Sequence, residues 1–267
     1  VLTITHPSYD PKELRRTGAT TWVLSTISFV PTIETPAAPT ATAGGPGGGT
    51  PTTYYYKVTA IAAETLEESL ASPSANASRD LTVTGNYIDI DPPNAIRFNV
   101  YKLSSGLYGY IGQTDGTAFR DNNITADVSQ TPPEASTPFN AAGDYPGTVG
   151  YHDQRRCFAG TNNKPQNFWA TRSATESNLS YSIPTRDDDA IIFRIAAREV
   201  NRIRHIVSAD DLILLTSGGE WKVAPQNSDL LTPDSAWPKQ VGTEGAANVQ
   251  PALTSGSIIY VQEAGSR

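Results

Sequence analysis

The chain contains few side chains that could perform acid–base, nucleophilic or metal-binding chemistry. It has one cysteine, Cys157, and three histidines, His6, His152 and His205, without the short spacing that metal ligands show. No Gly-x-Ser-x-Gly nucleophile elbow occurs. Cys157 lies in the run Arg-Arg-Cys-Phe-Ala, which is typical of a strand, so we expect a buried apolar residue rather than a nucleophile. A single cysteine also excludes a disulfide within the chain.

The acidic residues suggest two further possibilities, calcium binding and glycoside hydrolysis. Three consecutive aspartates, residues 187–189, could bind calcium, but adjacent strand residues point to opposite faces, so we expect a solvated turn. Glu220 beside Trp221 is the one carboxylate with an aromatic neighbour that suits a sugar, and Gly218-Gly219-Glu220 is more simply a hairpin turn. We therefore predict that the chain is not an enzyme and requires no metal or other cofactor.

A group of arginines could bind phosphate if it were gathered on a helix. Arg194, Arg198 and Arg202 are four residues apart and would line one face of a helix over residues 193–205. Alternating apolar residues favour two strands instead, separated by a break that begins at Glu199. In that case we expect the arginines to form surface ion pairs with Glu199 and the aspartate run, and phosphate binding is the less favoured alternative.

Composition is typical of a globular protein. The 267 residues are 38% hydrophobic and 18% charged, which permits a buried core. No run approaches the roughly 18 apolar residues of a membrane span. The net charge of −7 argues against a broad basic face that binds nucleic acid. Since the sequence lacks methionine, even at position 1, we expect it to be a piece of a longer protein.

Short β-branched and aromatic runs, separated by clusters of Gly, Pro, Asn and Asp, predict an all-β fold with almost no helix. In the clearest run, Tyr54, Tyr56, Val58 and Ala60 would share one face of a strand. Similar runs occur at residues 87–90, 98–102, 212–216 and 257–261.

Three tyrosines are the candidate contact residues for a glycan or another partner. Tyr55, Tyr108 and Tyr110 could form a platform on which sugar rings stack. The same residues are explained more simply if alternate tyrosines belong to the core and the rest form cross-strand pairs.

Two shifts in composition divide the chain into three segments. Residues 31–51 are rich in Thr, Ala, Pro and Gly, and residues 131–146 are rich in Pro. The Gly-rich run 44–49 lacks Gly-Lys-Ser/Thr, so we expect a flexible linker or a long hairpin rather than a phosphate loop. We predict the first strands of a platform in residues 1–33, an inserted β-sandwich in 34–140 and the remainder of the platform in 141–267.

The inserted segment, from residue 36 to about residue 139, resembles a fibronectin type III-like module. The residues that carry this resemblance are 54–61, Glu67-Glu68-Ser69 with Ser72, 98–102, Phe119 and Asp121. The Tyr-rich run precedes the Asn-Val-Tyr-Lys run, which reverses their usual order. The resemblance therefore implies a β-sandwich, of fibronectin type III or immunoglobulin-like type, with a permuted strand order.

The whole chain resembles nozzle-type, tail tubular protein B-like proteins of short-tailed phages and related prophages. The resemblance is carried by motifs in a fixed order, at residues 6–9, 13–16, 22, 108–112, 121–124, 152–161, 163, 165–166, 169, 187–191 and 216–221. In that family, strands around the inserted module build a β-propeller-like platform, so strands before and after the insertion are expected to share a sheet. A full member is several hundred residues longer, which implies a platform incomplete at the C-terminal end.

This resemblance implies a structural protein of the virion, assembled in the bacterial cytoplasm. The chain would be one subunit of a ring in the phage tail, around the channel through which DNA leaves the capsid. The implied partners are other copies of the chain, adjoining tail or head–tail adaptor proteins, and DNA in transit without sequence recognition. An acidic channel would repel DNA phosphates. The alternative is an adhesin that binds carbohydrate or a receptor through the sandwich.

Overall fold

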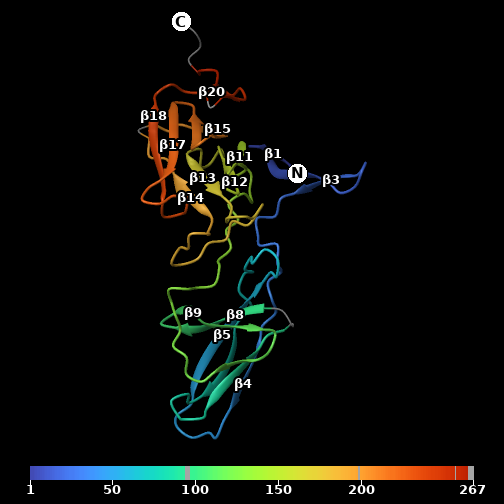
Figure 1. The fold of residues 1–267 in the computed structure, drawn as a ribbon, viewed down its shortest axis with the longest axis vertical. Coiled ribbons are helices and arrows are strands. Elements are labelled where there is room, and N and C mark those ends of the chain that lie inside the picture. The colour runs from blue at the N-terminus through green and yellow to red at the C-terminus, as the bar shows by residue number, and fades with distance from the viewer. Residues whose placement is uncertain (94–96, 198, 256, 264–267) are drawn as a thin grey trace. The chain divides into compact units, whose positions relative to one another are not determined.

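The computed structural model describes residues 1–93, 97–197, 199–255 and 257–263 (Figure 1). The described residues form strands and loops without a helix, and therefore include no helix long and apolar enough to cross a membrane. The predicted all-β fold is confirmed. The chain divides into two compact units, of which unit 1 comprises Val1–Val30, Ser136–Leu179 and Asp187–Arg267, and unit 2 comprises Pro31–Ala135 and Ser180–Arg186.

Unit 2 contains two antiparallel sheets. Its strands are β4 (Thr40–Gly44), β5 (Thr52–Ile61), β6 (Ala75–Arg79), β7 (Tyr87–Asp91), β8 (Arg97–Ser104), β9 (Leu107–Asp115) and β10 (Phe119–Asp121). One sheet has the strand order β10-β7-β4 and the other has the order β6-β5-β8-β9. Apolar side chains from both sheets belong to one core.

The alternation of apolar residues along β5 determines which face of the four-stranded sheet enters the core between the two sheets. Tyr56, Val58 and Ala60 are buried and Tyr54 is partly buried, as the sequence predicted. Ile88 of β7 is completely buried and joins the same core from the other sheet. Each large apolar side chain buried here contributes on the order of 1.5–3 kcal/mol to folding, so the two sheets stabilise each other.

A buried ion pair lies at the edge of this core, where β10 ends. Asp121 is fully buried, and its Oδ2 accepts the Tyr56 hydroxyl at 2.7 Å and lies 2.8 Å from Lys102 Nζ. Its Oδ1 accepts the backbone N–H of Ile124 at 2.7 Å. Burial and the hydrogen bond to Asp121 raise the pKa of Tyr56, which keeps the hydroxyl protonated as a donor. Because each charged group has partners, its burial is tolerated.

The segment Ser180–Arg186 belongs to unit 2, although it follows a long stretch of unit 1 in the sequence. A second buried carboxylate, Glu68, binds it there. Its Oε2 accepts Nη1 of Arg186 at 3.1 Å, and its Oε1 accepts the hydroxyls of Tyr101 at 2.5 Å and Thr59 at 2.6 Å. The sequence analysis did not anticipate this return, because Glu68 and Arg186 are 118 residues apart.

The Gly-rich run 44–49 connects the two sheets of unit 2. Of the two alternatives expected for it, a linker or a long hairpin, the hairpin is wrong, because β4 pairs with β7 whereas β5 pairs with β6 and β8. Gly47 has a φ of 91° and donates its N–H to Asn86 Oδ1 at 2.9 Å, while Thr50 N–H donates to Asp80 Oδ2 at 2.9 Å. Glycine is needed because this backbone conformation is costly for other residues.

Unit 1 contains a three-stranded sheet, two four-stranded sheets and a two-stranded ribbon. Its strands are β1 (Leu2–His6), β2 (Tyr9–Arg16), β3 (Trp22–Thr26), β11 (Thr148–His152), β12 (Arg155–Ala159), β13 (Asn167–Ala170), β14 (Ile191–Arg194), β15 (Ile203–Ser208), β16 (Leu212–Thr216), β17 (Gly219–Pro225), β18 (Ala236–Gly242), β19 (Ala252–Thr254) and β20 (Ser257–Ile259). The strand orders are β1-β2-β3, β11-β12-β13-β14, β15-β16-β17-β18 and β19-β20. Each four-stranded sheet is an antiparallel meander of consecutive strands.

The region considered as a helix contains two strands, β14 and β15, as predicted. Ile191, Ile195 and Ile203 are buried in the main core of unit 1. Arg198, the middle arginine of the expected helical face, lies outside the described residues. Ile191, Phe193 and Ile195 are directed into the core while Ile192 and Arg194 between them are exposed, so the two-residue alternation outweighs the four-residue spacing of the arginines.

The N-terminal strands join unit 1 through a core rather than through backbone pairing. Among the described residues, β1–β3 pair only with one another, so the predicted sheet shared by strands before and after the insertion is wrong. Instead, Ile27 and Phe29 enter a core with Phe139, Phe158 and Trp169. The ring centroids of Phe29 and Phe158 are 5.2 Å apart in an edge-to-face arrangement.

Two neighbouring arginines of β12, Arg155 and Arg156, are buried and bind different segments of unit 1. Arg155 Nη1 donates to the carbonyl of Asp189 at 2.6 Å, which fixes the aspartate turn. Arg156 Nη1 lies 3.3 Å from Glu13 Oε2 on β2. Hydrogen bonds from Arg15, and then from Arg156, lower the pKa of Glu13 and keep it ionised. The strand β12 therefore anchors both the aspartate turn and the N-terminal sheet.

Asp121→Ala should destabilise unit 2 by about 3–5 kcal/mol, because Lys102 would stay buried without its counter-charge. Tyr56→Phe should cost only about 1 kcal/mol, since it removes one hydrogen bond and preserves the ion pair. Peptide-resolved hydrogen exchange of β5 and β8 in increasing urea would measure both effects.

Tryptophan fluorescence provides an internal control for this comparison. All four tryptophans belong to unit 1, at positions 22, 169, 221 and 237. The urea concentration at the midpoint of the fluorescence transition should therefore be the same in both variants as in the unmodified chain. Equal destabilisation by the two substitutions would contradict the importance assigned to the buried charge pair.

Candidate functional site

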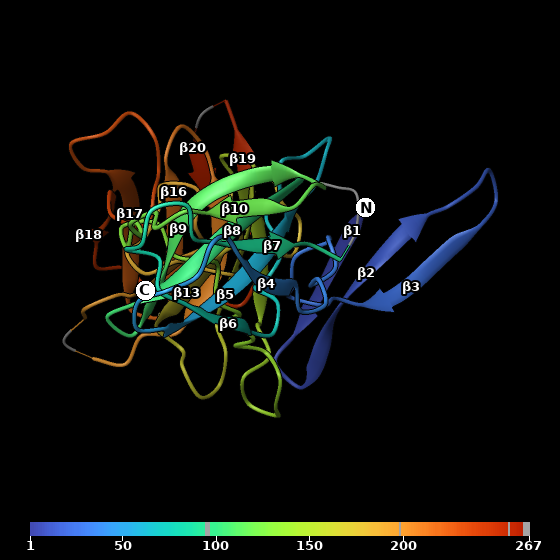
Figure 2. The ribbon, with the colours of Figure 1, turned by 90° about the horizontal axis from the view of Figure 1, so that it is seen from below.

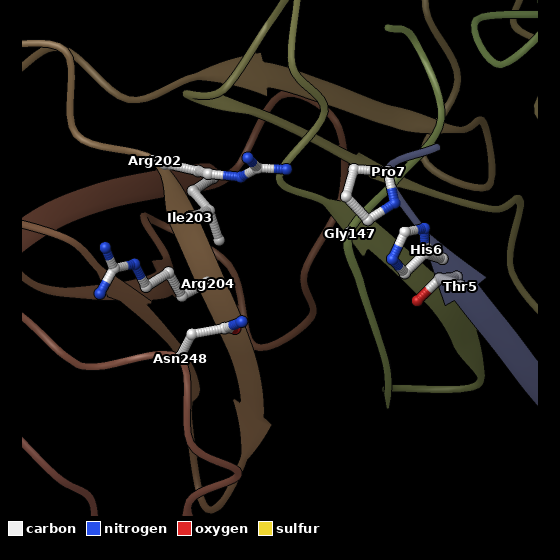
Figure 3. Close-up of a pocket in the computed structure, with 8 residues that line it drawn as sticks. All are labelled: Thr5, His6, Pro7, Gly147, Arg202, Ile203, Arg204 and Asn248. Carbon is white, nitrogen blue, oxygen red and sulfur yellow. The ribbon is translucent and has the colours of Figure 1, made fainter. Parts of the chain in front are cut away.

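A polar hollow of about 320 Å³ in unit 1 brings together segments that are far apart in the sequence (Figure 3). It lies between the end of β1 and the start of β15. Its lining residues are Thr5, His6, Pro7, Gly147, Arg202, Ile203, Arg204 and Asn248. Within the described part of the chain, no carboxylate lines it.

Arg202 supplies positive charge to this hollow. Its Nη2 donates to the carbonyl of Gly160 at 2.6 Å, which holds the half-buried guanidinium against the wall. Burial and the neighbouring charge of Arg204 both lower the pKa of Arg202. No carboxylate in the described ranges lies within ion-pairing distance of Arg202. The guanidinium is therefore a positioned cation without a protein counter-ion there.

Arg204 lines the same hollow but directs its guanidinium away from the gap (Figure 3). Its Nη2 donates to Glu263 Oε1 at 2.8 Å and its Nη1 donates to the carbonyl of Ala246 at 2.7 Å. The hydrogen bond with Glu263 raises the pKa of Arg204. The amide of Asn248, in contrast, points across the gap toward the opposite wall (Figure 3).

The end of β1 forms the opposite wall of the hollow. His6 Nδ1 accepts the backbone N–H of Ser8 at 3.1 Å, so the neutral imidazole carries its proton on Nε2 and is a donor there. Gly147 lies beside the guanidinium of Arg202. A Cβ at position 147 would be 3.2 Å from Arg202 Nη2 and 2.9 Å from the Gly160 oxygen, so glycine leaves the room that the arginine occupies.

A second surface of interest is one face of the β1–β3 sheet, which we call the outer face. The strand register aligns Leu2, Leu14 and Leu24 across the sheet and sets Trp22 opposite Arg16. The outer face also carries Ile4 and Lys12. The exposed fractions of its most accessible apolar residues are 56% for Leu2, 44% for Ile4, 57% for Trp22 and 56% for Leu24.

The other face of this sheet is directed toward the rest of unit 1. The hydroxyls of Thr3 and Tyr151 are 2.6 Å apart, and Glu13 contacts Arg156. Figures 1 and 2 both show β2 and β3 projecting from the other strands of the unit. The outer face is therefore apolar, basic and open.

The three tyrosines predicted as contact residues have different surroundings in unit 2. Tyr55 is 40% exposed on β5. Tyr108 lines a hollow of about 330 Å³, and Lys57 Nζ lies 4.6 Å from the centroid of its ring. The ring of Tyr110 packs edge-on against Tyr101 with centroids 6.0 Å apart. Tyr55 and Tyr110 do not line the hollow that contains Tyr108.

The aspartate run forms a turn, as predicted, but its expected solvation is wrong for Asp189, which is fully buried. Arg172 contacts Asp188, and its Nη1 lies 3.2 Å from Asp189 Oδ1. Arg194 instead donates to Gln166 Oε1 at 2.9 Å, so its predicted ion pair with the aspartate run is wrong. Among the described residues, no group of His, Cys, Asp and Glu is arranged to hold a metal ion.

The loop before Glu220 is a hairpin turn between β16 and β17, as predicted, and Trp221 packs into the core of the unit. Glu220 accepts a hydrogen bond from the hydroxyl of Tyr260.

One pair of potentially reactive residues was missed by the sequence analysis. Ser208 Oγ lies 2.8 Å from His152 Nδ1, and Asp153 Oδ2 lies 3.6 Å from His152 Nε2. The order of these contacts, serine to histidine to aspartate, is similar to that in a Ser–His–Asp triad. Neither Ser208 nor His152 lines either hollow described above, and we assign the pair no catalytic role. Their proximity depends on how β11 packs against β15, which has no local sequence signal.

Comparison with known proteins adds no assignment, since no protein-family model and no curated protein matches this chain.

Cys157 should be unreactive toward iodoacetamide at pH 8 in the folded protein. It is 1% exposed, and burial raises its pKa to about 12, so the thiolate is scarce and shielded. Mass spectrometry after alkylation should show an unmodified native chain and one modification in guanidinium chloride. Rapid stoichiometric labelling without unfolding would contradict the placement of Cys157 in the core.

Proposed function

We propose that this chain is a structural subunit of a short-tailed phage tail, one of several copies that form a ring around the DNA exit channel. The outer face of the β1–β3 sheet carries this proposal. Contiguous exposed apolar side chains on a folded protein mark a surface that is covered in an assembly. The assignment to a tail nozzle rests on the resemblance of the ordered sequence motifs.

The occupant proposed for the outer face is a second copy of the chain. Lys12 and Arg16 give this face positive charge, whereas the chain as a whole carries a net charge of −7. A symmetric contact of the outer face with itself would bring these cations together. A head-to-tail contact with a different, acidic part of the next copy avoids this repulsion. Repeated head-to-tail contacts form a ring where the rotation between copies closes, as this proposal requires.

The architecture of each unit is compatible with this role. Two consecutive four-stranded antiparallel meanders in unit 1 have the connectivity of propeller blades, which supports a propeller-like platform. Two sheets around one core in unit 2 support a fibronectin type III-like module. In this proposal the module contacts an adjoining tail protein or the host envelope. The net negative charge would reduce adhesion of DNA phosphates during transit.

Carbohydrate recognition by an adhesin has less support. The ammonium group of Lys57 lies over the ring of Tyr108, and Tyr110 packs against Tyr101. The rings of Tyr55, Tyr108 and Tyr110 therefore do not offer one continuous stacking surface around the hollow.

Replacing both Trp22 and Leu24 by serine should weaken self-association at least tenfold. The two side chains would lose apolar burial of about 1.5–3 kcal/mol each if they are fully covered in the contact. Sedimentation equilibrium over a concentration series would measure the change.

The matched control is Leu66→Ser, which removes a side chain that is 64% exposed in unit 2. This variant should associate like the unmodified chain. A chain that sediments as a monomer up to its solubility limit, or a control that weakens association equally, would contradict a contact through the outer face.

The virion assignment is tested separately by immunogold electron microscopy of particles from a host that carries the gene. Antibodies against unit 2 should decorate the tail end of intact particles, because the proposed subunit is part of the tail. A chain found only in the soluble fraction of lysed cells, with unlabelled particles, would exclude a virion protein.

A further inference from the structure

We propose that the hollow between β1 and β15 is a binding site for a phosphate group, specifically that of a small phosphomonoester. Its donors come from three separate segments, β1, the start of β15 and the loop that contains Asn248 (Figure 3). This proposal does not depend on the tail assignment.

The positive charge of the hollow favours an anionic ligand. The half-buried guanidinium of Arg202 uses one N–H on the carbonyl of Gly160 and has no carboxylate partner in the described ranges. A guanidinium has five N–H donors, so donors remain for a ligand. The adjacent cation, Arg204, is paired with Glu263 and directs its guanidinium away from the gap (Figure 3). Glu263 does not line the hollow.

The arrangement of donors favours phosphate over carboxylate. His6 contributes an Nε2–H, because its Nδ1 accepts the N–H of Ser8. Thr5 adds a hydroxyl from the same wall, and Asn248 adds an amide from the wall that carries Arg202 (Figure 3). A planar carboxylate is satisfied by one arginine fork, whereas a tetrahedral phosphate has oxygens directed toward both walls at once.

The size of the hollow favours a phosphomonoester. Its volume of about 320 Å³ is at the lower end of the range for small-molecule sites, roughly 300–1,000 Å³, and exceeds what a bare phosphate ion fills. The walls come from Thr5–Pro7 on one side and 202–204 on the other, so a ligand of this size can contact both walls at once.

The binding groups are held in place before a ligand arrives. Arg202 is fixed by the Gly160 carbonyl, and the absence of a side chain at Gly147 leaves room for its guanidinium. His6 is oriented by the Ser8 N–H. Preorganised donors reduce the entropy lost on binding.

Isothermal titration calorimetry of the full chain would test this site at constant ionic strength, in a buffer free of phosphate and sulfate. The probes are inorganic phosphate, a nucleoside monophosphate, acetate and a short single-stranded oligodeoxynucleotide without a terminal phosphate. We expect saturable binding of the nucleoside monophosphate, and binding at least tenfold weaker in Arg202→Gln and in His6→Ala. Because His6 is exposed, its replacement by alanine should not disturb folding. The His6→Ala variant therefore still tests the site if Arg202→Gln does not fold.

Arg194→Gln is the matched control, since Arg194 is an exposed arginine of the same unit outside the hollow. It should bind the monophosphate like the unmodified chain. Equal binding of acetate would overturn the phosphate assignment, and binding of the oligonucleotide in preference to the monophosphate would replace the monoester by a phosphodiester backbone. Absence of binding to every probe, or equal loss in the control, would overturn the site.

Discussion

Burial of Arg156 is the constraint on which the arrangement of unit 1 depends. A guanidinium that is 1% exposed needs polar partners, because an unpaired buried charge costs several kcal/mol, and carboxylates supply them here. Glu13 of β2 supplies one, and Glu176 lies 3.6 Å from Nη2. Since β1–β3 share no backbone pairing with the later strands among the described residues, this ion pair and the core around Phe29 determine where the N-terminal sheet lies.

Both surfaces with functional potential follow from that placement. Once Glu13 directs one face of the sheet toward β12, the opposite face must carry Leu2, Leu24 and Trp22 toward solvent. The same placement brings the end of β1 opposite β15 and thereby creates the hollow that contains Arg202. The proposed assembly surface and the proposed phosphate site thus both depend on the ion pair and the core that place the N-terminal sheet.

The sequence predicted those features that depend on local alternation. The inner face of β5 and the two strands on either side of Glu199 follow from apolar side chains at a period of two. The burial of Cys157 follows from its place in a strand-like run. Features formed by residues distant in sequence were not predictable in this way. Glu68 and Arg186, His152 and Ser208, and the walls of the hollow each join segments whose proximity is created by packing between sheets.

The errors have a related physical origin. The Gly-rich run has the composition of a hairpin, yet its strands join different sheets because β4 finds its partner in β7. The aspartate run has the composition of a solvated turn, yet Asp189 is buried because Arg155 and Arg172, from other strands and loops, satisfy its polar groups. The composition of a segment limits the conformations that it can adopt. Contacts with residues distant in the sequence determine whether the segment is buried or exposed.

The alternation of side chains along β1 connects the two proposed sites. Leu2 and Ile4 face outward, whereas Thr3 and Thr5 face the rest of unit 1, so successive residues of one short strand serve different surfaces. A slip of one residue in the register of β1 would exchange the two sets and place leucine and isoleucine against the polar hollow. The pairing of Leu2 with Leu14 and of Thr3 with Glu13 therefore has to be maintained for either site to exist. Glu13 pairs with Thr3 in this register and also forms the ion pair with the buried Arg156. The buried guanidinium therefore helps to hold β1 in register.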